Sequence, residues 1–315
     1  MKNIPIIAYF LGMLLFIHTT AKAQKSIDEK FNDIDEIEIK GGFCDVVIVG
    51  SNQSQTTLSA TISGSGDKNY ELEYEKIGSR LTVFLKDNKK NGKWKNENLQ
   101  GVIKIETNRK NKITATTSSG DIGINNFKDN TFTIASTSGS ISATELDGTI
   151  NIASTSGNIN LENSKGTIST KNTSGNQCIK DSEGNIVAKN TSGDIELSQF
   201  VGTATAENTS GGITIKAVEA SLKLVNTSGG IRGEQVKVTN HSTFAATSGD
   251  IDIQFSNKIE DLNFELKSSS GNIKGIGSKK QSGFSSDGGT INSTNTSGKY
   301  TIKGVTSSGS QNYTN

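Results

Sequence analysis

The sequence has few of the side chains that fill a wide hydrophobic core. Of its 315 residues, 31% are hydrophobic and 6% aromatic, whereas 34 are glycine. An ordinary globular domain carries a larger apolar share. A narrow core, filled by one or two aliphatic side chains in each of many repeats, is compatible with this composition. A partly disordered secreted chain is the competing interpretation.

Proline and an excess charge are also lacking. The single proline is Pro5, so the rest of the sequence contains none. This absence suits long hydrogen-bonded strands, because proline cannot donate a backbone hydrogen bond. The 33 Lys and Arg residues nearly balance the 32 Asp and Glu residues. This balance predicts no nucleic-acid partner and no polybasic membrane surface.

Cysteine is scarce: the sequence has only Cys44 and Cys178, at unrelated positions of their segments. In an oxidising compartment the two could form a disulfide. The alternative, two separately buried thiols, is favoured because nothing in the spacing brings them together.

The first residues are typical of an export signal. Lys2 precedes an apolar run over residues 4–17, and Ala-Lys-Ala at 21–23 fits a cleavage site. We therefore expect residues 1–23 to be a signal peptide. The run is shorter than the roughly 20 residues of a spanning helix, and no comparable run follows, so no transmembrane segment is expected in the mature chain.

A Ser-Gly step recurs along the chain at intervals of 19, 18, 18, 18, 18, 18, 20, 22 and 27 residues. The glycines of this step are Gly120, Gly139, Gly157, Gly175, Gly193, Gly211, Gly229, Gly249, Gly271 and Gly298. Thr or Ser stands before the step, and Asp, Asn, Gly or Ser follows it everywhere except at Gly298, which Lys299 follows. Such periodicity is the signature of a repeat architecture, and glycine suits corners that need positive φ or close backbone approach.

Aliphatic residues follow most of these glycines at alternate positions, which is the pattern of a β-strand. The first of them form a predicted core column of Ile122, Ile141, Ile159, Ile195, Ile213, Ile231, Ile251 and Ile273. Gln177 interrupts the column, so either the strand slips there or a polar side chain is accepted inside. Stacking of the repeats buries the apolar face and pairs each backbone with its neighbours. The predicted fold is all-β: a single-stranded parallel β-helix (β-solenoid) with coils of about 18 residues and right-handed winding.

Asparagine recurs three residues before the glycine, at Asn172, Asn190, Asn208 and Asn226. Stacked asparagines can bond to one another, so these positions predict an asparagine ladder along the axis. The resulting Asn-Thr-Ser triplets match a glycosylation sequon, but the repeat itself accounts for them.

We expect three parts: the signal peptide at 1–23, an N-terminal cap with irregular first coils at 24–116, and the regular solenoid at 117–315, looser after about 275. Within the cap, residues 86–98 are lysine-rich and contain the only tryptophan. Lys93, Trp94 and Lys95 could contact a glycan or an acidic partner, although a solvated hairpin tip explains the same residues.

The sequence lacks recognisable catalytic, metal-binding and nucleotide-binding motifs. Convergent carboxylates and a paired histidine, which polysaccharide-cleaving β-helix enzymes need, are not indicated. The calcium-binding nonapeptide and a phosphate-binding loop before a helix are missing too. We expect no catalytic, cofactor or metal site.

The opening pattern from Ile37 to Gly50, the strand ending in Ser118-Ser119-Gly120-Asp121-Ile122 and the T-S-G-(D/N)-I units resemble a family of bacterial β-strand-repeat proteins described as adhesins, related to the head GIN-type auto-transporter adhesin domains. The resemblance covers nearly all of the mature chain and implies an exported protein of attachment rather than catalysis. It carries over no ligand residues.

The expected function is therefore an exported, non-enzymatic interaction module at the periplasm, outer surface or outside the cell, with a protein or glycan partner at the envelope. A periplasmic structural or sensory protein is the alternative, and a β-helix enzyme acting on polysaccharide is the third.

Overall fold

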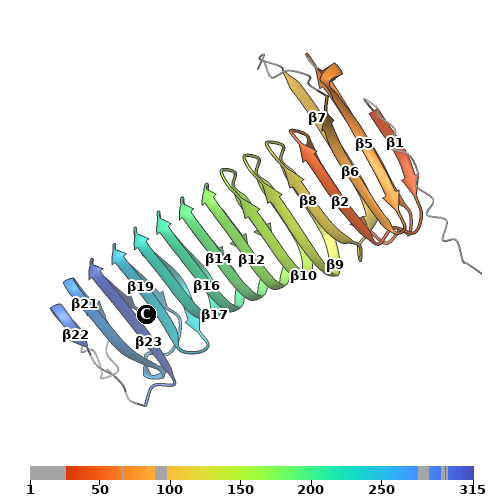
Figure 1. The fold of residues 1–315 in the computed structure, drawn as a ribbon. Helices are drawn as coiled ribbons and strands as arrows, with labels where there is room; N and C mark the ends of the chain where they lie inside the picture. Colours follow the sequence, from red (N-terminus) through yellow and green to blue (C-terminus); the bar gives the residue numbers. More distant parts are fainter. Residues whose placement is uncertain (1–25, 66, 89–97, 276–283, 292–294, 296) are drawn as a thin grey trace, which may run out of the picture.

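The computed structural model describes residues 26–65, 67–88, 98–275, 284–291, 295 and 297–315. Within them the chain forms a long stack of coils (Figure 1). Each coil places one strand in each of two parallel sheets, so the predicted β-solenoid is confirmed. The first sheet holds the strands that lead into the Ser-Gly corner, and the second holds those that leave it.

The middle of the stack follows the sequence order. Its strands are β9 (Ile122–Ser136), β10 (Ile141–Ser154), β11 (Ile159–Glu162), β12 (Lys165–Ser174), β13 (Gln177–Lys180), β14 (Glu183–Ser192), β15 (Ile195–Ser198), β16 (Val201–Ser210), β17 (Ile213–Ser228), β18 (Ile231–Val238), β19 (Ser242–Ser248) and β20 (Ile251–Phe255). Each coil also has a second turn, which leads from the second sheet back to the first. The longer strands β9, β10 and β17 run through this turn and so belong to both sheets. Strands one coil apart pair in parallel, for example Ile168 with Ile186.

The predicted core column lies inside the stack. In the second sheet Ile122 pairs with Ile141, Ile141 with Ile159, and Ile195 with Ile213 and then Ile231 and Ile251. All of these side chains are buried. Because β-strand side chains alternate between faces, one aliphatic at every second position is enough to fill so narrow a core.

Gln177 occupies its place in the column without a slip of the strand, pairing with Ile159 and Ile195. Its side chain is 1% exposed. Its Oε1 accepts a hydrogen bond from Thr170 Oγ1 at 2.6 Å, and its Nε2 donates to the Lys189 carbonyl at 2.6 Å. A buried polar group is accepted here because its partners are built into the neighbouring coils.

Replacing Gln177 with leucine should lower the free energy of unfolding by about 1–3 kcal/mol, because the Thr170 hydroxyl and a backbone carbonyl lose their buried partner. The double variant Thr170→Val with Gln177→Leu should recover part of this loss. Urea denaturation of the wild type, both single variants and the double variant measures the coupling. A fully additive cycle would contradict the account.

At the N-terminal end the coils do not follow the sequence order. The elements are β1 (Ser26–Phe31), β2 (Glu36–Gly42), β3 (Asp45–Ser51), β4 (Thr56–Gly64), the 3-10 turn Asp67–Asn69, β5 (Tyr70–Ile77), β6 (Arg80–Asp87), β7 (Leu99–Asn108) and β8 (Lys112–Thr117). Strand β2 lies between β6 and β8, and β3 lies between β7 and β9. The first coil is therefore inserted between two later ones.

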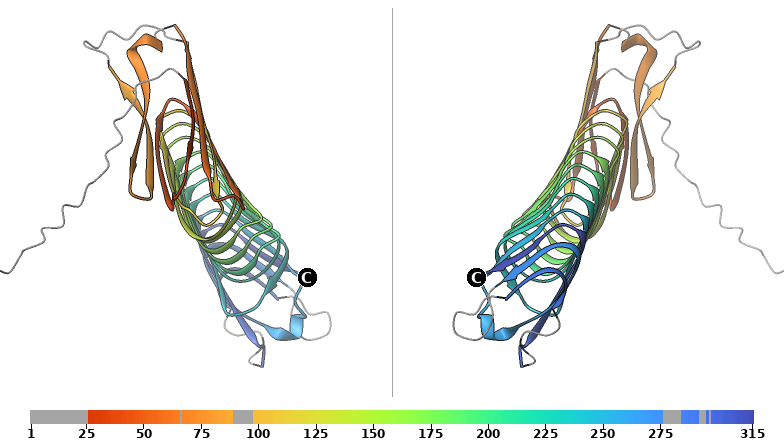
Figure 2. Two further views of the ribbon diagram at one scale, coloured as in Figure 1. Left: turned by 90° about the vertical axis from the view of Figure 1, so that its right-hand side faces the viewer. Right: turned by 90° about the vertical axis from the view of Figure 1, so that its left-hand side faces the viewer.

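Antiparallel strands close this end. Strand β5 pairs with β6, and β4 pairs with β7 and β1. Figure 2 shows these antiparallel strands at one end of the stacked coils. They give the last parallel strands a partner, as a solenoid cap must.

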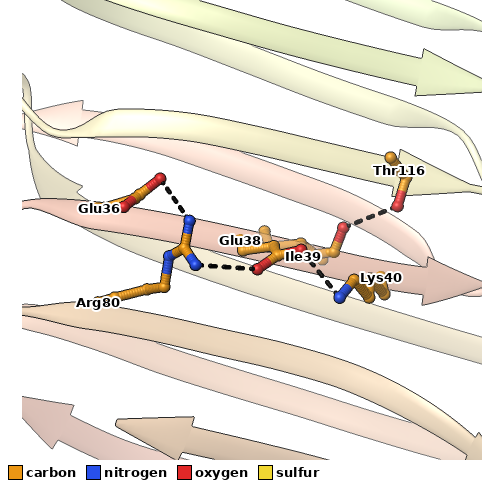
Figure 3. A network of polar contacts seen from close by, with 6 residues as sticks. All are labelled: Glu36, Glu38, Ile39, Lys40, Arg80 and Thr116. Atoms are coloured by element: carbon orange, nitrogen blue, oxygen red, sulfur yellow. Dashed lines mark hydrogen bonds and ion pairs between the residues drawn. The ribbon is translucent and has the colours of Figure 1, made fainter. Parts of the chain in front are cut away.

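Ion pairs also join the inserted coil to its neighbours (Figure 3). Glu36 contacts Arg80 at 2.9 Å on one side and Lys112 at 3.0 Å on the other. These two cations hold the pKa of the Glu36 carboxyl below its usual value. Thr116 Oγ1 also donates to the Ile39 carbonyl of the inserted coil at 3.1 Å.

The C-terminal end shows a second insertion. Its elements are the 3-10 turn Ile259–Asp261, β21 (Leu262–Gly275), β22 (Phe284–Ile291), β23 (Tyr300–Ser308) and β24 (Gln311–Thr314). Strand β23 lies between β19 and β21, and β24 lies between β20 and β21. Strand β22 pairs antiparallel with β21 at the end of the stack.

This insertion corrects the predicted corner at Gly298. The corner that stacks between Gly249 and Gly271 is Gly309, while Gly298 lies in a turn beside the backbone of Leu262. Thr306 Oγ1 donates to the Gly309 carbonyl at 3.1 Å, as a corner requires. Gln311 then stands between Ile251 and Ile273 in the core column.

Candidate interaction surface

A column of threonines runs along the outside of the Ser-Gly corners. The coils with corners from Gly139 to Gly249 each contribute the residue two places before the glycine, and all of these side chains are exposed. The members are Thr137, Thr155, Thr173, Thr191, Thr209, Thr227 and Thr247. The parallel register holds them one coil apart, about 4.8 Å. The result is a regular row of hydroxyl groups on a rigid backbone.

A groove follows this threonine column on the first-sheet side. Two depressions mark it, of about 420 Å³ around Thr137 and Thr155 and of about 360 Å³ around Thr191 and Thr209. They meet at Lys171, which lines both. We call this feature the corner groove, running from Thr116 to Thr227.

The corner groove has polar residues beneath it. Ser136 and Ser154 line one depression, and Asn172, Asn190 and Asn208 line the other. All five are buried. Its outer wall is the strand column that includes Ala135, Lys189 and Val225.

The asparagines stack in register, but they do not form the predicted ladder of mutual hydrogen bonds. Each Nδ2 donates instead to the carbonyl of the glycine in the preceding coil, at 2.8–3.0 Å. The Oδ1 atoms of Asn172, Asn190, Asn208 and Asn226 are buried and accept no hydrogen bond from any residue that the structure describes. The Asn Nδ2 donates to the glycine carbonyl rather than to the neighbouring Asn Oδ1, because the tight turn at glycine points this carbonyl at the side-chain amide.

A different ladder lies on the other side of the corner. Where the residue after the glycine is Asp or Asn, its side-chain Oδ1 accepts the backbone N–H of the equivalent residue in the next coil. Asn176 accepts from Asp194 at 2.9 Å, and Asp194 accepts from Gly212 at 2.7 Å. This Asx ladder explains why Asp and Asn follow the repeat glycine. The sequence shows the residue type but not that its partner lies one coil away.

Ion pairs also connect residues one coil apart. Lys189 contacts Glu207 at 2.8 Å beside the corner groove. The other pairs separated by 18 residues are Lys165–Glu183, Glu162–Lys180, Lys216–Glu234 and Glu219–Lys237. Each is solvent-exposed and contributes about 0–1 kcal/mol. Their main effect is that neighbouring coils neutralise each other's charge.

The remaining predicted contact residues, Lys93, Trp94 and Lys95, lie outside the described residues, as does the predicted signal peptide at 1–23. Cys44 and Cys178 are free thiols. Burial raises the pKa of the Cys44 thiol to about 12. Burial also raises the pKa of Cys178, which is partly exposed on the second sheet.

Over the residues that the structure describes, no cluster of three or more His, Cys, Asp or Glu side chains is arranged to hold a metal ion. In the same part of the chain, no helix is long and apolar enough to cross a membrane.

The family model described as Toastrack DUF4097 matches residues 34–215 and, a second time, residues 202–312. The comparison with curated proteins gives no match.

Three solved crystal structures are similar over 92% of this chain. One is a proposed lipid-binding protein of Parabacteroides distasonis ATCC 8503, with 18% identity, 97% of that chain covered and a TM-score of 0.40. Another is a proposed adhesin of Bacteroides fragilis NCTC 9343, with 12% identity, 97% covered and a TM-score of 0.28. A third is a proposed cell adhesion protein of Clostridium sporogenes ATCC 15579, with 10% identity, 99% covered and a TM-score of 0.20. These likenesses bear on neither the ligand nor the partner of this chain.

Proposed function

The chain belongs to the Toastrack DUF4097 family, and on that premise we propose that it is an exported, non-enzymatic interaction module of the bacterial surface or envelope. A closer relation to the head GIN-type auto-transporter adhesin domains stays a prediction. The proposed export rests on the signal-like pattern of residues 1–23.

The observation that carries the proposal is the corner groove beside the threonine column. Parallel pairing fixes the backbone on both sides of every coil, so the exposed hydroxyls are ordered before any ligand arrives. Such preorganisation lowers the entropy that binding costs. An elongated, uncharged partner could hydrogen-bond to several coils at once, and each coil would then contribute to the binding free energy.

Replacing Thr173, Thr191 and Thr209 with lysine should abolish this binding while leaving the fold intact, because all three side chains are exposed. The matched control places three lysines at Ser142, Asn160 and Gln254, which are exposed on the second sheet. Beads coated with each protein are tested for retention on surfaces coated with glycans or extracellular proteins. We expect at least about a tenfold loss for the groove variant only. Equal retention of both variants would contradict the proposal.

Location is tested separately, by protease treatment of intact cells. Digestion of the protein supports a surface module. Protection until the outer membrane is opened supports the periplasmic alternative, a structural or sensory envelope protein.

A further inference from the structure

The Asx ladder lacks an Oδ1 acceptor at Ser140 and again, over two consecutive coils, at Gly212 and Gly230. Asp194 accepts the N–H of Gly212, but Gly212 and Gly230 have no side chain to continue the ladder. The N–H groups of Gly230 and Asp250 therefore receive no acceptor from the preceding coil. The ladder resumes where Asp250 accepts the N–H of Ser310 at 2.7 Å.

Neither glycine is required by its backbone φ, and only at Gly230 would a side chain press on a neighbouring backbone atom. At Gly212 an added Cβ would come no closer than 3.5 Å to another atom, and at Gly230 its nearest neighbour would be the Asp250 carbonyl oxygen at 3.2 Å. Neither residue has φ in the left-handed region. By contrast, the preceding Gly211 and Gly229 have φ of 110° and 124° and touch the backbone of the coil before. The first glycine of each Gly-Gly pair makes the corner, and the second leaves a space.

That space is a depression of about 390 Å³. It is lined by Gly212, Thr214, Gly230 and Arg232, by the buried Ile213 and Ile231, and by Gly249, Asp250 and Asp252. Arg232 is exposed and forms no ion pair with any described residue. The two carboxylates are engaged on the far side: Asp250 with Ser310, and Asp252 with the Asn312 amide at 3.0 Å.

We propose that this gap in the Asx ladder binds the side-chain carboxylate of an aspartate presented by a protein partner. The carboxylate would take the place of the missing rung, accepting from the N–H groups of Gly230 and Asp250 while the Arg232 guanidinium pairs with it. Backbone N–H groups in a concave turn and a planar guanidinium are both suited to a carboxylate.

A polypeptide fits the gap better than an acidic polysaccharide. The rung that is missing has the chemistry of an aspartyl or asparaginyl side chain elsewhere in the ladder. A polyuronate would place further carboxylates along the axis, beside Asp194 on one side and Asp250 on the other. The added carboxylates would meet these like charges without an N–H partner, whereas a single aspartyl carboxylate is compensated by the two N–H groups and Arg232. The inference deepens the proposed interaction function by naming a partner class, at a site separate from the corner groove.

The test is a titration of the ¹⁵N-labelled protein with a blocked Gly-Asp-Gly peptide, followed by amide chemical shifts. We expect saturable shifts centred on the Gly230 and Asp250 amides. The matched Gly-Gly-Gly peptide should leave these amides unchanged. Arg232→Gln should weaken the peptide's binding several-fold.

A ladder-completing variant provides the second arm. Gly212→Asn with Gly230→Asn supplies the two missing acceptors, so it should abolish the shifts. Retained binding by this variant would overturn the inference. So would shifts with oligogalacturonate but not with the aspartyl peptide, or no shifts at these amides with either. None of these outcomes depends on the groove variant or on the location of the protein in the cell.

Discussion

Replacing Gly211 with alanine is expected to lower the free energy of unfolding by about 2–6 kcal/mol. Gly211 has φ of 110°, where a residue with a Cβ costs about 1–3 kcal/mol. The added Cβ would also overlap the carbonyl oxygen of Gly193 in the preceding coil. Relief of that overlap must separate two coils whose backbones are hydrogen-bonded, and overpacking of this kind costs about another 1–3 kcal/mol.

The adjacent Gly212→Ala variant is the matched control. The same methyl group is added one residue further on, where the space is open and φ is not left-handed. Its effect should stay within about 1 kcal/mol. Chemical denaturation of both variants measures the difference. Equal destabilisation would show that the corner does not depend on close backbone approach.

The corner glycines could be predicted from the sequence because their cause is local. Every coil needs the same tight turn, so the same residue returns at the same spacing, from Gly120 to Gly249. The core column follows from the same argument, since strand alternation and the repeat period together decide which isoleucines face inward.

The order of the coils at the two ends could not be predicted in this way. Asn295-Thr296-Ser297-Gly298 matches the repeat in sequence better than Thr306-Ser307-Ser308-Gly309, yet Gly309 makes the corner. A local motif does not specify which coil lies next to which. That choice depends on long-range packing, as between Phe264 and Tyr313, whose ring centroids are 5.4 Å apart.

The hydrogen bonds of the asparagine column and of the Asx ladder could not be predicted from the sequence either. The sequence predicts that Asn172 and its equivalents stack, and the structure stacks them. Their hydrogen bonds depend on where the neighbouring carbonyl points, which no sequence pattern states. The gap at Gly212 and Gly230 could not be predicted for the same reason. In the sequence, a second glycine after the corner glycine is only one of several residue types found at that position.

The inserted C-terminal coil leads to the second large effect, which is expected for Tyr313→Ala. Tyr313 is 1% exposed and lies against Phe255, with ring centroids 6.2 Å apart, and against Phe264. Its hydroxyl donates to Gln311 Oε1 at 2.8 Å, and burial raises its pKa above the usual range. Loss of so large a buried ring should cost about 3–5 kcal/mol.

The loss should be confined to one end of the stack, because each coil of a solenoid contacts only its neighbours. Since β24 lies between β20 and β21, hydrogen exchange should speed up in both of these strands in Tyr313→Ala, while β12 and β14 keep their protection. Tyr313→Phe keeps the ring and removes only the hydrogen bond, so it should cost about 1–3 kcal/mol. Faster exchange in β21 without any change in β20 would mean that the last coil is not inserted between them, and that the stack follows the sequence order to its end.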